Sequence, residues 1–421
     1  MKNVRLSLLS IACALALLLS SCGLIRPAGT AGGNTPADTS ADTDGKSPSV
    51  SAAVTDGADV NTDAPDTQTD KVPTEKTVLS FLGCGDNIVY YGNVREAAAV
   101  AVSGGRQYNF APTYSMVADL ISSADISFIN QETLMAGEGY EFTYYPTFNG
   151  PQDMGYDLVE LGFDVIGMAN NHMLDKGGDG LLSTIKFWKG QPVLEIGGYE
   201  NKEDYNTLHI LEKEGVKIAF LSYTYGTNGI SLAAGYDLAI PYLDEQTVKT
   251  QVAKARGEAD FVIVSVHWGD ENSFTPNGEQ KKYASIMANA GADVIIGHHP
   301  HVVQPVEWIE RDGGGQTLCV YSLGNFIGEQ AQDYNMVGGM ISFDIVSDAD
   351  GVRAENPVLI PTVYYFDTSF YGNCVYLMEN FTEELAASHG IRAYQNTTTL
   401  ERLRKYVTDT VDAQFLPESF R

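Results

Sequence analysis

Seven short runs of apolar, β-prone residues divide the sequence after residue 76. Each run is nearly continuous in apolar residues and is bounded by polar residues or glycine, which is typical of strands covered on both faces. The runs are Val78–Leu82, Ile126–Ile129, Val165–Met168, Ile218–Ser222, Phe261–Val266, Val294–Ile296 and Leu318–Tyr321. The segments expected to form helices between them are Tyr114–Ser123, Gln152–Leu161, Gly180–Lys189, Thr247–Arg256 and Gln280–Ala290. This alternation predicts a layered α/β domain.

Polar side chains follow five of these runs directly. The clusters are Gly85-Asp86-Asn87, Asn130-Gln131-Glu132, Asn170-Asn171-His172 with Asp175, His267-Trp268-Gly269-Asp270-Glu271, and Gly297-His298-His299-Pro300-His301. Five of the seven histidines of the chain fall in them. Because ligands of open α/β sheets bind outside the carboxyl ends of the strands, we expect these side chains to meet in one site.

Imidazole, carboxylate and amide oxygen groups are ligands of divalent transition metals. His299 and His301 alternate in the sequence, so in an extended segment both rings would project to the same side. Two metal ions about 3.5–4 Å apart can clamp a phosphoryl group and generate hydroxide from water near neutral pH. Taken alone, Asp86 fits a turn or cap residue, Glu132 a salt-bridge partner and His267 a packed core histidine. The five clusters together predict a metal site.

The N-terminus carries the features of an exported lipoprotein. Residues 1–21 join a basic start to a short apolar run, which is typical of a signal peptide. The following Leu19-Ser20-Ser21-Cys22 resembles a bacterial lipobox, in which Cys22 would be lipidated. The alternative is an ordinary signal peptide with an incidental cysteine. Lipidation would hold the protein on the extracytoplasmic face of the cell membrane.

Composition divides the remaining chain. Residues 22–76 are rich in Thr, Asp and Ala and almost lack large apolar residues, so we expect an acidic, disordered tether. The next part, 77–345, is expected to form the main domain. Residues 346–421 would be a C-terminal extension packed on it, with an extended stretch at Pro357–Tyr365 and a helix near Thr398–Asp412.

The net charge of the chain limits the molecules that it can bind, and its cysteines fit the interior of the domain. The net charge of −28 argues against nucleic acid as a partner, because a chain this acidic repels polyanions. No run of lysine or arginine suggests an anion-binding groove. Of the five cysteines, Cys84 and Cys319 lie in or beside apolar runs, and we expect them to be buried thiols.

The ordered motifs resemble the CapA family, which is associated with bacterial poly-γ-glutamate capsule synthesis. The motifs are Gly85-Asp86, Asn130 with Glu132, Asn170-Asn171-His172 with Asp175 and Gly177, His267-Trp268-Gly269 with Glu271, Gly297 to His301, and Ser322 to Phe326. The resemblance covers about residues 78–330. It implies a branch of the calcineurin-like metallophosphoesterases and a four-layer α/β/β/α sandwich.

The resemblance also implies roles for single residues. The metal ligands would be Asp86, Glu132, Asn171, His267, Glu271, His299 and His301, holding two divalent transition metal ions such as Mn, Zn or Fe. His172 would protonate the leaving group and Asp175 would orient it. Two positions depart from the pattern. Ile88 stands where the motif Asp-x-His has histidine, and Glu132 stands where an aspartate is usual.

Three functions are compatible with these features. The first is a membrane-anchored capsule synthesis protein with a metal-dependent hydrolase site of the phosphoesterase type. The second, favoured by Ile88, is a non-catalytic metal-binding factor for assembly or export of the polymer. The third is an extracellular binding or adhesion module, which leaves the strand-end ligands without a purpose. The expected partners are the membrane, an anionic capsule polymer or a phosphoester, and a membrane complex for capsule synthesis.

Overall fold

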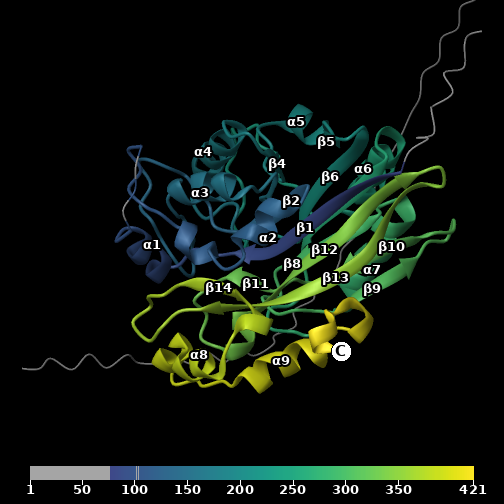
Figure 1. Cartoon of the computed structure of the whole chain (residues 1–421). Helices are drawn as coiled ribbons and strands as arrows, with labels where there is room; N and C mark the ends of the chain where they lie inside the picture. Colours follow the sequence, from purple (N-terminus) through teal and green to yellow (C-terminus); the bar gives the residue numbers. More distant parts are fainter. Residues whose placement is uncertain (1–75, 101, 103) are drawn as a thin grey trace, which may run out of the picture. The chain divides into compact units, whose positions relative to one another are not determined.

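The computed structural model describes residues 76–421 other than 101 and 103. The expected signal peptide, the lipidation site Cys22 and the tether up to residue 75 lie outside the described residues. In the described part of the chain, no helix combines the length and the apolar character that a membrane crossing requires. Figure 1 shows the course of this part from β1 to the C-terminus.

Among the described residues, eight strands form the first sheet, in the order β14-β13-β12-β1-β2-β3-β4, with β11 paired to the end of β1. The bounds are β1 (Thr77–Asn87), β2 (Ile126–Gln131), β3 (Val165–Gly167), β4 (Leu194–Ile196), β11 (Asn325–Ile327), β12 (Val337–Asp348), β13 (Gly351–Tyr365) and β14 (Cys374–Leu377). Strands β1 to β4 run parallel, and β12, β13 and β14 add antiparallel strands on the other side of β1. The first strand of the chain is therefore central in its sheet.

Six further strands of the described chain form the second sheet, in the order β5-β6-β7-β8-β10-β9. The bounds are β5 (His209–Lys213), β6 (Val216–Thr224), β7 (Phe261–His267), β8 (Val294–His298), β9 (Val306–Glu310) and β10 (Gln316–Val320). Strands β6, β7, β8 and β10 are parallel, and the two edge strands are antiparallel to their neighbours. In both sheets the strand-end clusters therefore come at the carboxyl edge.

The helices cover the outer faces of the two sheets (Figure 1). Their bounds are α1 (Tyr91–Ala97), α2 (Ala118–Ser123), α3 (Asp153–Leu161), α4 (Gly177–Lys189), α5 (Lys202–Asn206), α6 (Glu245–Glu258), α7 (Gly278–Ala290), α8 (Glu383–Ser388) and α9 (Leu400–Thr408). Side chains of α3 and α4 join the core of the first sheet, and those of α6 and α7 pack on the second.

Alternation along β7 shows how the layers are built. Phe261 and Ile263 belong to the core between the sheets, whereas Val262 and Val264 pack with α6 and α7. The Phe343 ring of β12 lies 6.4 Å from the Phe261 ring across the sheets. A strand covered on both faces must be apolar at successive positions, which explains the continuous apolar runs. The fold is the expected four-layer α/β/β/α sandwich.

Most of the expected elements form. All seven apolar runs lie in strands, apart from one or two terminal residues, and the five helical segments overlap α2, α3, α4, α6 and α7. The expected stretch Pro357–Tyr365 lies within β13, and the last expected helix is the shorter α9. The position expected for the start of the C-terminal extension, residue 346, falls inside β12. Cys84 and Cys319 are free, buried thiols, as expected, and Cys374 is a third.

Candidate metal centre

The strand-end side chains converge at the carboxyl edge of both sheets. Asp86 lies in β1 and His267 is the last residue of β7. The other residues lie within five residues after the end of a strand: Glu132 after β2, Asn171 and His172 after β3, Glu271 after β7, and His299 and His301 after β8. Gly85 permits the close approach of β1 to the turn before β11, because a Cβ atom there would lie 2.1 Å from the Gly324 carbonyl oxygen. The backbone N–H of Asp86 donates to that carbonyl at 3.0 Å.

Glu132 stands at the centre of the cluster. Its side chain is only 1% exposed, and neither carboxylate oxygen accepts a hydrogen bond from a described residue. Its Oε1 lies 3.9 Å from His172 Nε2, 3.8 Å from His267 Nε2 and 3.9 Å from His301 Nε2. Burial and the negative charge of Asp86 raise the pKa of Glu132 well above its usual value. These distances are too long for hydrogen bonds but suit groups that share a cation.

Asp86 is held by the residues that follow β8. Its Oδ2 accepts from the backbone N–H of His299 at 3.2 Å and lies 3.1 Å from His301 Nδ1. Its Oδ1 lies 3.3 Å from His298 Nδ1. Burial acts to raise the pKa of Asp86, but the two imidazoles outweigh it and hold the pKa well below the usual value. A charged carboxylate in this buried position requires positive partners.

His301 lies between two carboxylates. Burial acts to lower its pKa, but the charges of Glu132 and Asp86 raise the pKa to about 9. Its Nδ1 also lies 3.0 Å from Asn325 Oδ1 of β11. In the protein without metal, the protonated ring of His301 therefore supplies the positive charge that the Glu132 and Asp86 carboxylates require.

His267 and Asn171 face each other on the opposite side of the cluster. His267 Nε2 lies 2.9 Å from Asn171 Oδ1, and the Asn171 amide donates to Asn228 Oδ1 at 3.1 Å. The rings of His267 and His299 are 4.8 Å apart. Burial, with His299 nearby, lowers the pKa of His267 well below its usual value, and burial, with His301 nearby, lowers that of His299 to about 3. Both rings are therefore neutral and able to bind a cation through nitrogen.

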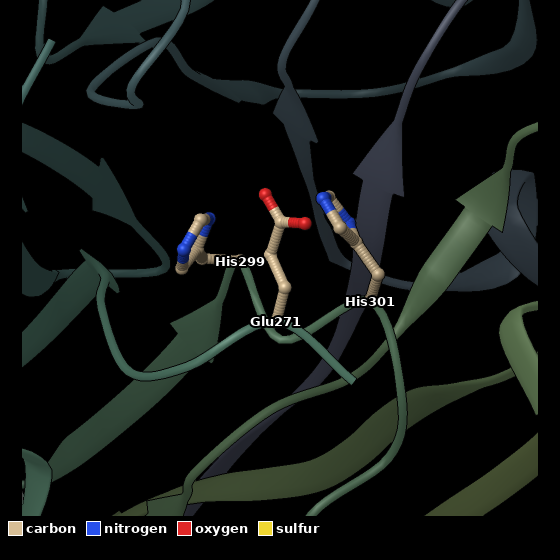
Figure 2. Close-up of side chains that lie close together, drawn as sticks. All are labelled: Glu271, His299 and His301. Carbon is tan, nitrogen blue, oxygen red and sulfur yellow. The ribbon is translucent and has the colours of Figure 1, made fainter. Parts of the chain in front are cut away.

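Glu271 completes a second group with His299 and His301, whose ligand atoms all lie within 4.8 Å of one another (Figure 2). A first group with the same property contains Asp86, Glu132 and His301. His301 therefore belongs to both groups. The two groups contain only nitrogen and oxygen donors, a set suited to Mn, Zn or Fe.

The segment after β8 is not extended, so the expectation about alternating rings was wrong in its geometry. His299 and His301 have φ values of 95° and 56°, in the left-handed region that side chains rarely adopt. A turn rather than a pleat brings the two rings to within 5.8 Å. Such strain costs about 1–3 kcal/mol per residue and persists only where the surroundings enforce it.

His172 and Asp175 form a pair beside the ligand cluster. His172 Nδ1 lies 2.7 Å from Asp175 Oδ2, which also accepts the backbone N–H of Phe148 at 2.6 Å. The edge of the His172 ring meets the Phe148 ring at 4.7 Å. With Nδ1 bonded to Asp175, Nε2 is the nitrogen that faces Glu132.

Three residues of the site were not singled out as ligands or catalytic groups by the sequence. Asn325 belongs to the motif Ser322 to Phe326, but only the fold brings it to His301. Asn228 and Tyr225 lie in the loop after β6 and belong to no motif. The Tyr225 ring lies 4.6 Å from the His299 ring, tilted against it, and Tyr225 is 42% exposed, so it stands between His299 and the solvent.

The cluster fits divalent metal ions on its own chemistry. It contains a buried carboxylate whose two oxygens have no hydrogen-bond partner in the described chain, and imidazole nitrogens at about 4 Å from it. His267 Nδ1 and His299 Nδ1 likewise lack hydrogen-bond partners among the described residues. Buried polar atoms without partners are rare in folded proteins, and a bound cation would satisfy these.

Two sheets covered by helices, with this donor set at their carboxyl edge, form the α/β/β/α sandwich that the sequence motifs led us to expect. The family profile described as bacterial capsule synthesis protein PGA_cap matches residues 80–330. The chain therefore belongs to this capsule synthesis family.

Curated relatives carry CapA in their names. The capsule biosynthesis protein CapA of Bacillus anthracis is 35% identical over 207 residues, covering 48% of this chain and 49% of the relative. The PGA biosynthesis protein CapA of Bacillus subtilis is 30% identical over 203 residues, covering 48% and 52%. The chain thus spans about half the length of these curated relatives. The calcineurin-like phosphoesterase YfkN from Bacillus subtilis aligns with a TM-score of 0.41 at 15% identity, covering 79% of this chain and 100% of that structure.

Proposed function

We propose that this chain is a membrane-anchored CapA-like capsule synthesis protein with a divalent-metal-dependent hydrolase site of the phosphoesterase type. The observation that carries the proposal is the Glu132 carboxylate, which is buried without a hydrogen-bond partner among the described residues and lies about 4 Å from three imidazole nitrogens. Such a carboxylate destabilises a protein without a cation and favours binding of one. Anchoring is supported by the lipobox-like sequence at Cys22.

Two ions are supported by the two ligand groups that share His301. Asp86 and Glu132 would hold one ion, and Glu271 with His299 the other, while Asn171 and His267 complete the set. Divalent ions bound there supply Lewis acidity and a water of lowered pKa. The residues themselves contribute fixed geometry, because nearly all of them are buried and held by backbone or side-chain contacts.

His172 would supply the proton for the departing oxygen. Asp175 holds Nδ1, so the ring cannot rotate freely and Nε2 points toward the ligand cluster. A proton held at Nε2 can be donated to a substrate oxygen that lies between His172 and the ligands. The exposed Tyr225 ring beside His299 would form one wall of the substrate entrance.

The substrate would be a phosphoester or an anionic capsule polymer, with poly-γ-glutamate suggested by the relatives and a membrane complex for capsule synthesis as partner. The net charge of −28 opposes binding of a polyanion to the bare protein surface. Bound cations would offset that repulsion at the site.

The test is to purify the protein, measure bound metal by elemental analysis, and assay hydrolysis of a generic phosphodiester with Mn²⁺ or Zn²⁺. We expect metal in the wild type, loss of metal in His299→Ala, and loss of about 10²–10⁴-fold in turnover in His172→Ala. His209→Ala is a matched control, because His209 bonds the Glu195 carbonyl away from the cluster. A wild type without metal, or turnover unchanged in both site variants, would refute the proposal.

A second candidate is a metal-binding factor for assembly or export of the polymer that hydrolyses nothing. The observation that favours it is Ile88, an apolar and buried side chain where the family pattern places a histidine. This function predicts metal without turnover, and polymer binding that survives His172→Ala.

A further inference from the structure

The loop that carries Glu271 rests on the C-terminal part of the chain. Glu271 is exposed, unlike Asp86, Glu132, His299 and His301, so packing around its own side chain does not hold it in place. Three residues further on, the Phe274 ring is half-buried. It stacks on Tyr406 of α9 at 5.5 Å and meets the edge of Tyr334 at 6.1 Å.

Polar contacts link the same helix to the ligand cluster. The Tyr406 hydroxyl donates to Asp333 Oδ1 at 3.0 Å, and Arg402 Nε lies 3.0 Å from Asp333 Oδ2. Asp333 is buried and begins the short 3₁₀ helix Asp333–Met336. That helix also carries Asn335, so the contacts of α9 with Asp333 support the segment in which Asn335 lies.

Asn335 connects this 3₁₀ helix to the two segments that carry the Glu271 group, one at Asn272 and the other at His301. Its amide donates to Asn272 Oδ1 at 2.8 Å, beside Glu271, and to the His301 carbonyl at 3.1 Å. The backbone N–H of Asn272 in turn donates to the Pro300 carbonyl at 2.8 Å. Asn272 has a φ of 63°, in the left-handed region that asparagine adopts more readily than most residues, and its two bonds fix the turn beside Glu271.

We propose that α9, through Tyr406, positions Glu271 against His299 and His301 and thereby sets the affinity of one of the two metal positions. The inference rests on the proposed metal site. It assigns a role to residues 400–408, which lie outside the segment matched by the family profile. Tyr406 is a positioning residue, since it touches Phe274 and Asp333 and no ligand atom. Asn335 also bonds the carbonyl of His301, which both groups share. Asp86 and Glu132, however, are buried and make no hydrogen bond to Asn272 or Asn335 in the described structure, so the group that contains them is expected to lose less affinity.

The experiment is a calorimetric titration of the full, detergent-solubilised chain with Mn²⁺ alone. Removing a group that orients a ligand typically weakens metal binding about 10–100-fold. We expect Tyr406→Ala to weaken one Mn²⁺ position by that factor and to change the other by less than about twofold. Tyr406→Phe, which keeps the ring but loses the hydroxyl bonds, should fall between Tyr406→Ala and the wild type.

A double-mutant cycle separates positioning from general destabilisation. In a Glu271→Gln background, Tyr406→Ala should cause no further loss of Mn²⁺ affinity, because the ligand that it positions is already gone. Arg404→Ala is the control on the same helix, since Arg404 lies over the Phe420 ring at 4.7 Å and away from Phe274. It should bind Mn²⁺ as the wild type does. If Tyr406→Ala does not fold, Phe274→Ala breaks the same contact and leaves α9 in place.

Equal weakening of both positions, or a loss that persists in the Glu271→Gln background, would overturn the positioning role. Unchanged titrations in both Tyr406→Ala and Phe274→Ala would do the same while the metal site itself stands. A wild type that binds no Mn²⁺ would overturn this inference together with the proposed function.

Discussion

Replacing Glu132 by glutamine should raise the stability of the metal-free protein and reduce the stabilisation that bound metal provides. At neutral pH the surroundings disfavour the charged form of Glu132, because burial and Asp86 raise its pKa. The neutral amide of Glu132→Gln removes that cost and has nearly the same size. A buried neutral group without a partner, such as the glutamine amide, costs about 1–3 kcal/mol and a charged one costs more, so the metal-free variant should be more stable than the wild type by a difference on the order of 1–3 kcal/mol.

The corresponding change in melting temperature can be worked out from the size of the folded unit. A unit of about 350 residues has an unfolding entropy near 0.7 kcal/mol/K, so 1 kcal/mol shifts Tm by about 1.4 °C. The metal-free variant should therefore melt about 1.5–4 °C above the metal-free wild type. Mn²⁺ at about 100 times its Kd should stabilise the wild type by about 2.7 kcal/mol, or about 4 °C, for each ion bound, and the variant should lose the part that comes from the ion held by Asp86 and Glu132.

Calorimetry or thermal shift with chelator, and then with added Mn²⁺, measures both effects. Glu195→Gln is the control, because Glu195 is a buried carboxyl outside the cluster whose Oε1 accepts the Gly198 N–H at 2.6 Å. That variant should keep the full response to Mn²⁺. A Glu132→Gln protein that melts lower than the wild type without metal, and gains as much as the wild type does with Mn²⁺, would show that Glu132 is an ordinary structural carboxylate.

Three other measurements follow from the structure. Asp175→Asn should lower turnover by about 10²–10⁴-fold while bound metal stays constant, because it loosens His172 without removing a ligand; unchanged turnover in a kinetic assay would contradict this. Burial raises the pKa of Glu195 from 4.5 to about 8, so the folded protein retains a proton that the unfolded chain releases, and stability should fall as pH rises through this window. Glu195→Gln should flatten that slope in urea titrations, and an unchanged slope would count against it. Phe343→Ala should cost about 3–5 kcal/mol in chemical denaturation, because the ring packs between the sheets against Phe81 and Phe261, whereas a cost below 1 kcal/mol would contradict that packing.

The local sequence pattern predicts the buried strands well and the strands at the edges of the sheets poorly. Runs such as Phe261–Val266 are apolar on both faces, and five apolar residues out of six between polar ends are typical of a strand covered on both faces. Edge strands β5 and β9 carry charged and half-exposed residues, so their sequences resemble loops. Strand β12 was not anticipated, because its pairing with β1, such as Thr77 opposite Ser347, joins distant parts of the chain that no local pattern connects.

In the site, too, the local pattern predicts some features, whereas others depend on tertiary packing. Residue type and place after a strand point to Asp86, Glu132 and the histidines, since carboxyl ends of parallel strands share one edge. The contacts of Asn228 with Asn171, and of Asn325 with His301, depend on loops whose course is set by tertiary packing. The left-handed backbone at His299 and His301 also follows from packing, because isolated chains disfavour it.

The central place of β1 affects how fragments of this protein behave. The strand that covers its outer edge, β12, begins about 250 residues later, so a nascent chain exposes that edge and the Phe81 ring until most of it has been made. A recombinant fragment ending at residue 330 would contain the whole family-matched segment and still leave backbone donors and acceptors of β1 open to intermolecular pairing. The strands beyond residue 330 are therefore needed for solubility of the isolated domain, and expression trials should retain them.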